Sequence, residues 1–132
     1  MMSPQPTKVT VPFGLGAETV EGRQAFMAHT PTEIEIAPAT GAHQISLEFG
    51  LNPAAYQSSD GVQFEVILVQ PNGSRQTLYQ RFLQPAILKG DRGPQSVVLE
   101  PTGSLDGVLL FRTLPGGSPN FDWAYWSRIS IQ

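Results

Sequence analysis

The residues best suited to contact a ligand are concentrated near the C-terminus, in residues 120–128 of the 132-residue chain. The sequence there is NFDWAYWSR, which contains both tryptophans and one of the three tyrosines. An aromatic ring can stack on the apolar C–H face of a sugar, and neighbouring carboxylates, amides and arginines can hydrogen-bond its hydroxyls. The segment therefore has the residue types of a platform for a hydroxyl-rich ligand, provided that one ring is exposed.

The two-residue period of a β-strand predicts which ring that is. Trp123 and Tyr125 share parity with Ile129 and Ile131, so a regular strand buries both rings together and places Trp123 in the core. Trp126 then lies on the opposite face with Arg128 and is the better candidate for exposure. A β-bulge between the two tryptophans would reverse this assignment.

We predict that the ligand contacts two rings and two arginines. Trp126 and Tyr125 stack on it, and Arg92 and Arg128 bond its hydroxyls or an acidic group. Asp91 precedes Arg92 in the sequence and is expected to orient that arginine or its loop. The expected affinity is weak, because a shallow platform buries little ligand surface.

Three further residues are expected to support the fold. Trp123 is expected in the core, Asp60 in a turn, and Asp122 in the loop before the last strand, which it would tie. Removal of Asp122 is therefore predicted to damage folding rather than ligand choice.

A cluster of positive charge falls in one predicted hairpin and the loop after it. A solvated surface explains it, and a patch for an acidic or hydroxyl-rich ligand is the alternative. Its members are Arg75, Arg81, Lys89 and Arg92.

Metal and cofactor chemistry has little support in the sequence. The chain has no cysteine, so it has no disulfide and no thiolate metal site. Its loop aspartates, which include Asp60, Asp91, Asp106 and Asp122, do not follow a calcium-loop pattern and are interpreted as turn formers. We therefore expect no cofactor and no metal, with Ca²⁺ held by backbone carbonyls and one or two carboxylates as the alternative.

Catalysis is not expected either. His29 and His43 are the only histidines, and neither lies in a recognisable catalytic motif. A small hydrolase or isomerase would need one of them close to a carboxylate in a pocket. The sequence from Gly14 to Thr19 starts like a dinucleotide-binding fingerprint but lacks the third glycine and a following helix, so it is interpreted as a turn.

Length and composition limit the class of protein. A chain of 132 residues with 40% hydrophobic residues is long enough for one domain with one core. Its net charge of −3 argues against nucleic acid as a partner, and no apolar run is long enough to span a membrane. No signal peptide is visible at the start, and residues 1–7 are expected to be flexible. We treat residues 1–132 as a single domain.

Alternating apolar and polar residues predict a chain made almost entirely of short strands. Residues 32–37, 45–49 and 62–69 alternate most clearly, and 62–69 becomes apolar on both faces toward its end. Further strands are expected at residues 8–13, 23–29, 76–83, 95–100, 107–113 and 123–131. The 13 glycines and 12 prolines interrupt every candidate long helix.

Two local features are specific enough to predict in detail. Gln70-Pro71-Asn72-Gly73 is a hairpin turn, an interpretation we prefer to the formal glycosylation sequon at Asn72. Asn52 is expected to cap a single helical turn that has Pro53 at its first position. An eleven-residue loop over 84–94 favours crossing connections, and hence an all-β Greek-key or jelly-roll sandwich of about nine strands over an up-and-down barrel.

Two sequence blocks together resemble a known family. The first is SDGVQFEV at 59–66, preceded by FGL at 49–51; the second is FRT at 111–113, followed by NFDWA at 120–124. The pattern is similar to the NPCBM-type carbohydrate-binding modules and their bacterial envelope relatives, and RFLQP at 81–85 and DRG at 91–93 also look like those relatives. The resemblance covers about residues 23–132. The segment LPGGSPN at 114–120 departs from it, because it lacks the acids that the family usually has there.

The resemblance implies a galactose-binding-like jelly roll of the kind usually appended to an enzyme or membrane protein. The expected function is a non-catalytic, carbohydrate-binding-like accessory module of a larger bacterial envelope or secreted protein, with a glycan as its partner. The alternative is a structural or protein–protein interaction domain without a sugar site. The expected location is extracytoplasmic, and the sequence leaves a cytoplasmic one open.

Overall fold

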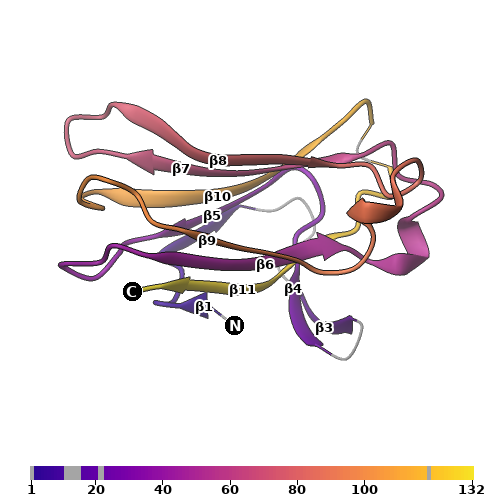
Figure 1. Cartoon of the computed structure of the whole chain (residues 1–132), viewed down its shortest axis with the longest axis horizontal. Helices are drawn as coiled ribbons and strands as arrows, with labels where there is room; N and C mark the ends of the chain where they lie inside the picture. Colours follow the sequence, from indigo (N-terminus) through magenta and orange to yellow (C-terminus); the bar gives the residue numbers. More distant parts are fainter. Residues whose placement is uncertain (1, 11–15, 21–22, 119) are drawn as a thin grey trace.

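The computed structural model describes residues 2–10, 16–20, 23–118 and 120–132. Within these residues the chain forms eleven strands and two single-turn 3-10 helices, arranged as two sheets packed face to face (Figure 1). The expected all-β jelly-roll sandwich is confirmed. No helix in the described part of the chain has the length and apolar character needed to cross a membrane.

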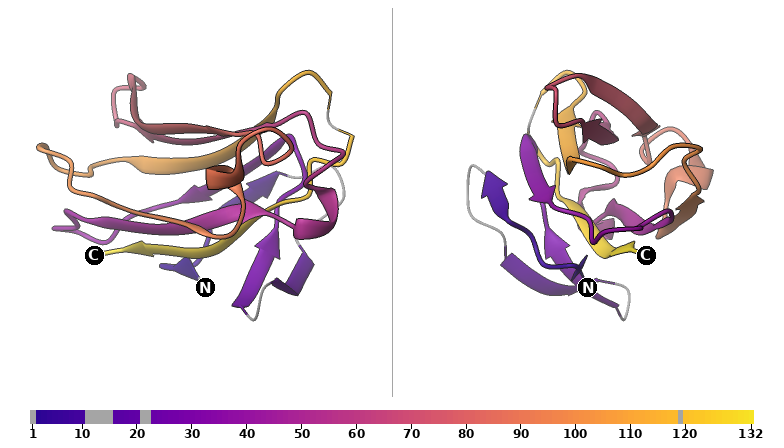
Figure 2. Two further views of the ribbon diagram at one scale, coloured as in Figure 1. Left: turned by 45° about the vertical axis from the view of Figure 1, so that its right-hand side comes forward. Right: turned by 90° about the vertical axis from the view of Figure 1, so that its left-hand side faces the viewer.

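Each sheet places strands that are distant in the sequence side by side. Sheet A has the order β3 (Gly16–Val20), β4 (Arg23–Met27), β11 (Ala124–Ile131), β6 (Ile45–Leu51), β9 (Gln95–Leu99), and β1 (Met2–Ser3) pairs with β11. Sheet B has the order β2 (Lys8–Thr10), β5 (Thr32–Ile36), β10 (Val108–Pro115), β7 (Val62–Val69), β8 (Arg75–Leu83). Because β10 and β11 each lie between two strands from earlier in the chain, the connections must cross the ends of the sandwich (Figure 2).

All nine expected strands are present, and β1 and β3 are additional. Residues 16–19 of the glycine motif form part of β3, so the interpretation of that part as a turn is wrong. Residues 11–13 of the first expected strand, and Gly14 and Leu15, lie outside the described residues. The expected flexible N-terminal segment also differs from the structure, because Met2 is only 2% exposed and β1 pairs in parallel with β11.

The core fills the space between the two sheets, as the alternation predicts. In β5, Ile34 and Ile36 are fully buried, whereas the intervening Glu33 and Glu35 are partly exposed. At the centre four rings pack together, with centroids 4.6 to 5.8 Å apart and mostly inclined or edge-on contacts. Each fully buried side chain of this size stabilises the fold by about 1.5–3 kcal/mol. The four rings are Phe49, Phe64, Phe111 and Trp126.

A second, smaller cluster covers the outer face of sheet A. It consists of Val20, Ala25, Met27 and Tyr125, with Trp123 packed against it. Tyr125 lies over Gly50 of the neighbouring strand, where an added Cβ would come within 2.8 Å of the tyrosine hydroxyl. Glycine at this position therefore makes room for the ring.

The loops separate into two groups at opposite ends of the sandwich (Figure 1). One group, which we call the aromatic end, contains residues 52–61, 84–94 and 116–123. The other, the polar end, contains residues 37–44 and 100–107 and the β7–β8 turn. The predicted turn is confirmed: Gly73, at φ +87°, donates its N–H to the Gln70 carbonyl at 2.8 Å. The predicted helical turn is η1 (Pro53–Ala55), capped by the Asn52 side chain.

Candidate ligand-binding site

The predicted exposure of Trp126 is wrong, and Tyr125 does not have the stacking role expected of it. Both side chains are 0% exposed: Trp126 lies in the core between the sheets and Tyr125 in the outer cluster. A ring without exposed surface has no face to offer a sugar, so neither residue serves as a stacking platform in this structure. The Trp126 indole also has no hydrogen-bond partner at Nε1 among the described residues, in keeping with a purely packing role.

A break in strand register explains the error. The pairing of β11 with β6 shifts between Trp126 and Arg128, which is a β-bulge. The extra residue reverses the parity, so Trp126 rather than Tyr125 lies on the same face as Ile129 and Ile131. The sequence allowed for a bulge between the two tryptophans, whereas the structure has the bulge after Trp126.

The long 84–94 loop uses Asp91 and Arg92 for its own structure. Asp91 is 3% exposed and accepts hydrogen bonds from Arg81 Nη2 at 2.7 Å and from the backbone N–H of Gln84 at 2.8 Å. Arg92 donates from Nε to the Pro85 carbonyl at 2.8 Å. The buried carboxylate thus holds the loop against β8, which excludes Asp91 itself from direct contact with a ligand.

Arg92 is also held from the neighbouring loop. Its guanidinium carbon lies 6.0 Å from the centre of the Tyr56 ring, and the Tyr56 hydroxyl accepts the N–H of Gly93 at 2.7 Å. These contacts tie the 84–94 loop to the segment that follows η1. Arg92 is half-buried, so part of the residue remains accessible to solvent.

Arg128 lies apart from this group. It is exposed on the outer face of sheet A, in a shallow depression of about 240 Å³ that Ser46, Ser130 and Gln132 also line. The structure therefore does not bring Arg92 and Arg128 together with the two predicted rings. A single site built from all of these residues, as the sequence suggested, is absent from the described part of the chain.

Asp122 connects three loops at the aromatic end. Its carboxylate, 1% exposed, accepts the hydroxyl of Thr30 at 2.7 Å and that of Ser59 at 2.8 Å. Burial raises the pKa of Asp122, an effect to which the charge of Asp60 adds and which the two hydroxyl bonds oppose. The carboxylate thus fixes residues 30, 59 and 122, which come from three different connections.

Asp60 makes a second connection of the same kind at the surface. It is exposed, and its Oδ2 accepts the N–H of Gly117 at 3.0 Å, which joins the 52–61 and 116–123 loops. Next to it, Ser59 Oγ also accepts the N–H of Gly61 at 3.2 Å. Asp60 and Asp122 together hold the segment that carries the exposed rings described next.

Phe121 and Trp123 form the exposed aromatic pair of this end. Their ring centroids are 5.8 Å apart, inclined at 43°. Phe121 is 47% exposed, and Trp123 is half-buried against the outer cluster. Phe121 adopts φ +59°, a left-handed conformation that is costly for a bulky residue and is often found at functional sites.

Sequence reasoning missed Phe121, although it lies inside the segment that was singled out. The available signal was its position in the loop before the strand, next to an aspartate expected to tie that loop. Trp123 was expected in the core, whereas its ring is partly exposed beside Phe121. An aromatic surface on a loop held by these hydrogen bonds can stack against the apolar face of a small molecule. Arg92 belongs to the 84–94 loop, which lies at the same end of the sandwich (Figure 1).

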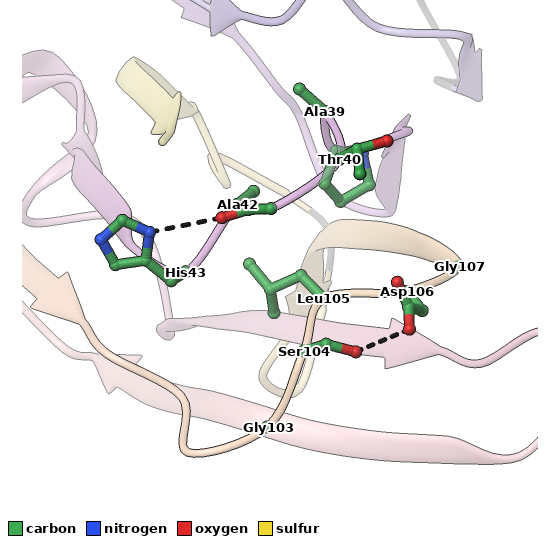
Figure 3. Close-up of a pocket in the computed structure, with 11 residues that line it drawn as sticks. Ala39, Thr40, Ala42, His43, Gly103, Ser104, Leu105, Asp106 and Gly107 are labelled. Atoms are coloured by element: carbon green, nitrogen blue, oxygen red, sulfur yellow. Dashed lines mark hydrogen bonds between the residues drawn. The ribbon is translucent and has the colours of Figure 1, made fainter.

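The polar end has a pocket of about 430 Å³ between residues 38–43 and 103–107 (Figure 3). His43 and Asp106 line it, but they lie on opposite sides of Leu105. The Asp106 carboxylate accepts the Ser104 hydroxyl at 2.7 Å, and His43 Nδ1 faces the Gly41 carbonyl at 3.4 Å. The histidine–carboxylate contact required by the hydrolase alternative is thus not made in this pocket.

Within the described residues, no three His, Asp or Glu side chains gather closely enough to hold a metal ion. His29, the second histidine, is half-buried in the connection between β4 and β5.

The two sheets and the connections that cross the ends of the sandwich define a jelly-roll β-sandwich. No family model and no curated protein matches the sequence, so the fold likeness rests on solved structures. A CBM51 module from Clostridium perfringens GH95, solved with methyl-galactose, matches with a TM-score of 0.64 and 14% identity over 97% of this chain and 94% of that one.

Two further solved structures share the fold. The CBM51-2 and INT domains of Clostridium perfringens ZmpB match with a TM-score of 0.66 and 13% identity; the match covers 96% of this chain but only 30% of that one. A CBM28 module specific for non-crystalline cellulose matches with a TM-score of 0.62 and 10% identity, over 89% of this chain and 79% of that one. At such identities the likeness establishes the fold alone, and it does not single out the NPCBM family.

Proposed function

We propose that this chain is a non-catalytic carbohydrate-binding module whose ligand stacks on Phe121 and Trp123. The observation that carries the proposal is the aromatic pair itself: two adjacent rings, one of them 47% exposed, on a loop tied down by Asp122 and Asp60. A ring surface that is rigid before binding loses little conformational entropy when a sugar stacks on it.

Charged and polar groups on neighbouring loops support a sugar as the ligand. Arg92 belongs to the 84–94 loop at the same end and is partly accessible to solvent, and an arginine can donate to the hydroxyls of a sugar. The fold likeness adds to this, because the neighbours solved with methyl-galactose and with GlcNAc are modules of the same architecture. We further propose an extracytoplasmic setting within a longer protein, as in the multidomain chain of which the ZmpB module is a part.

A glycan array followed by titration calorimetry tests the proposal. Wild-type protein is expected to bind at least one glycan with a Kd between about 0.1 and 10 mM, as befits a shallow site. Phe121→Ala should weaken that binding at least tenfold, equivalent to about 1.4 kcal/mol. Val98→Ala is the matched control, because Val98 is an exposed apolar residue on β9, distant from the pair.

The absence of any binding glycan would contradict the proposal, as would equal binding by wild type and Phe121→Ala. In either case the second candidate, a protein-interaction domain, gains support. It is favoured by Ile87 and Leu88, which are 74% and 49% exposed on the loop that Asp91 holds rigid. A contiguous exposed apolar patch is a feature of many protein-interaction sites.

A further inference from the structure

We propose that the pocket at the polar end is a second ligand site, which takes a small polyhydroxylated molecule such as a monosaccharide by hydrogen bonding without ring stacking. This pocket (Figure 3) lies between the 37–44 and 100–107 loops, at the opposite end of the sandwich from the connection between β10 and β11 (Figure 1). The proposal therefore stands or falls independently of the aromatic site.

The pocket is a concave space between two loops that are distant in the sequence. Its volume of about 430 Å³ exceeds that of the depression beside Arg128, about 240 Å³. The lining side chains are small, so backbone amides and carbonyls contribute much of the surface. Leu105 and Ala42, which are 5% and 8% exposed, are its buried apolar part.

Polar groups of both kinds face this space. The Asp106 side chain is exposed and accepts one hydrogen bond, from Ser104, which leaves further acceptor capacity on its carboxylate. Thr40 lies on the same side of Leu105 as Asp106, and His43 lies on the other side (Figure 3). A hydroxyl group both donates and accepts, so a ligand with several hydroxyls can pair with carboxylate, hydroxyl, imidazole and backbone groups at once.

Other ligand classes fit this lining less well. The Asp106 carboxylate disfavours an anion, and no aromatic side chain lines the pocket to stack on a flat apolar ligand. Within the described residues, no group of three potential metal-ligating side chains is found there. A polyol can form hydrogen bonds with the single carboxylate and with the neighbouring donors and acceptors at the same time.

The loops around the pocket are anchored to the sandwich. The backbone N–H groups of His43 and Gln44 donate to the Gln132 carbonyl at 2.6 and 2.8 Å, and Gln132 returns a bond to Gln44. On the other loop, Gly107 adopts φ +110° and packs directly on the backbone of Val69, where an added Cβ would clash. Both loops are therefore positioned before a ligand arrives, which limits the entropy lost on binding.

An NMR titration of ¹⁵N-labelled protein with GlcNAc and with methyl-galactose tests the proposal. Addition of at least one of the two sugars is expected to shift the backbone amide signals of residues 40–43 and 103–107 at millimolar concentration. Signals from the two ends of the molecule are resolved in the same spectrum, so binding at one end is read separately from binding at the other.

Three variants sharpen the titration. Asp106→Ala should weaken binding at the pocket about tenfold or more, because a charge-assisted acceptor is lost. Gly103→Leu adds a side chain where a Cβ meets no atom within 4 Å, so it should narrow the pocket without disturbing the fold. Asp60→Ala is the matched control; it removes an exposed loop aspartate from the other end and should leave pocket binding unchanged.

Two results would overturn the proposal: shifts absent from residues 40–43 and 103–107 with both sugars, or equal affinity of wild type and Asp106→Ala at this pocket. If CaCl₂ alone shifts these same signals and prevents the sugar from binding there, the proposal would also be overturned, in favour of a cation site. Thermal unfolding of each variant establishes that loss of binding is not loss of fold.

Discussion

The aromatic segment near the C-terminus has two parts, one exposed in a loop and one buried in a strand. In the loop part, Phe121 and Trp123 reach the surface and face each other at 5.8 Å. In the strand part, Tyr125 and Trp126 are fully buried on opposite faces of sheet A. The four residues are similar in chemistry and close in sequence, so the comparison shows that the start of β11, and not residue type, separates exposed rings from buried ones.

Removal of the buried tryptophan is expected to have the largest effect on stability. Trp126→Ala is expected to lower the free energy of unfolding by about 3–5 kcal/mol, because it leaves a cavity among Phe49, Phe64 and Phe111. Urea denaturation measures the change. Phe121→Ala is the control and should change stability by less than about 1 kcal/mol, since its ring is 47% exposed. Similar losses in the two variants would show that the division is wrong.

Asp122 lies between the two parts and is expected to show the next largest effect. Asp122→Ala removes the acceptor of two buried hydroxyl bonds, from Thr30 and Ser59, and should cost about 1–3 kcal/mol. The measurement is the same denaturation curve, with exposed Asp106→Ala as a matched control. A variant as stable as wild type would contradict the prediction that this carboxylate ties the loops.

The pH dependence of stability tests the burial of Asp122 in another way. Its pKa is raised in the folded state, so folding is favoured while the group is protonated. This contribution is fully present below the ordinary aspartate pKa of about 3.9 and is lost as the pH rises through the higher folded-state pKa.

The comparison that isolates this group is between wild type and Asp122→Asn. Relative to that variant, wild type is expected to lose stability as the pH is raised from about 3 to 7. Denaturation midpoints at several pH values provide the measurement, and the difference between the two proteins cancels the titration of the other acids. A difference that is constant with pH would show that the Asp122 pKa is not raised.

The two tryptophans should also differ in fluorescence. Trp123 is partly exposed and Trp126 is not, so acrylamide is expected to quench emission in Trp126→Phe, which retains only Trp123, more strongly than in Trp123→Phe. A glycan that stacks on the pair should reduce quenching only where Trp123 is present. Equal quenching in both variants would show that Trp123 is no more exposed than Trp126.

The smallest expected effect concerns the backbone of Phe121. At φ +59° glycine is favoured over other residues by about 1–2 kcal/mol, and its extra freedom in the unfolded chain offsets about 0.5–1 kcal/mol of this. Phe121→Gly should therefore raise the free energy of unfolding by up to about 1 kcal/mol while abolishing glycan binding. A destabilised variant would indicate that the ring contributes more to packing than its exposure suggests.

Local sequence patterns were sufficient to predict most of the fold. The alternation in residues 32–37 and 62–69 predicted which side chains are buried, and Asn52 with Pro53 predicted η1. These features depend on neighbours within a few residues along the chain, where strand periodicity and capping act. Strands β1 and β3 were missed, and a two-residue strand such as β1 is too short to show a periodic pattern.

The candidate site was harder to predict because it depends on contacts between distant segments. Asp91 and Arg92 looked available for a ligand in the sequence, yet Asp91 is bound by Arg81 and by the Gln84 backbone once the loop folds back on β8. The exposure of Trp126 depended on where β11 departs from regular pairing with β6. Neither the partner of a loop side chain nor the position of a bulge is encoded in local periodicity.

The sequence by itself determined the all-β class, the positions of nine strands, the 70–73 turn and the segment in which the aromatic residues gather. Only the tertiary structure decided which of those rings face solvent. The physical reason is that a one-residue register shift transfers a whole strand's side chains to the other face, and the shift in β11 arises from its pairing with a strand some 75–80 residues earlier in the chain. Burial of Trp126 is a consequence of that pairing.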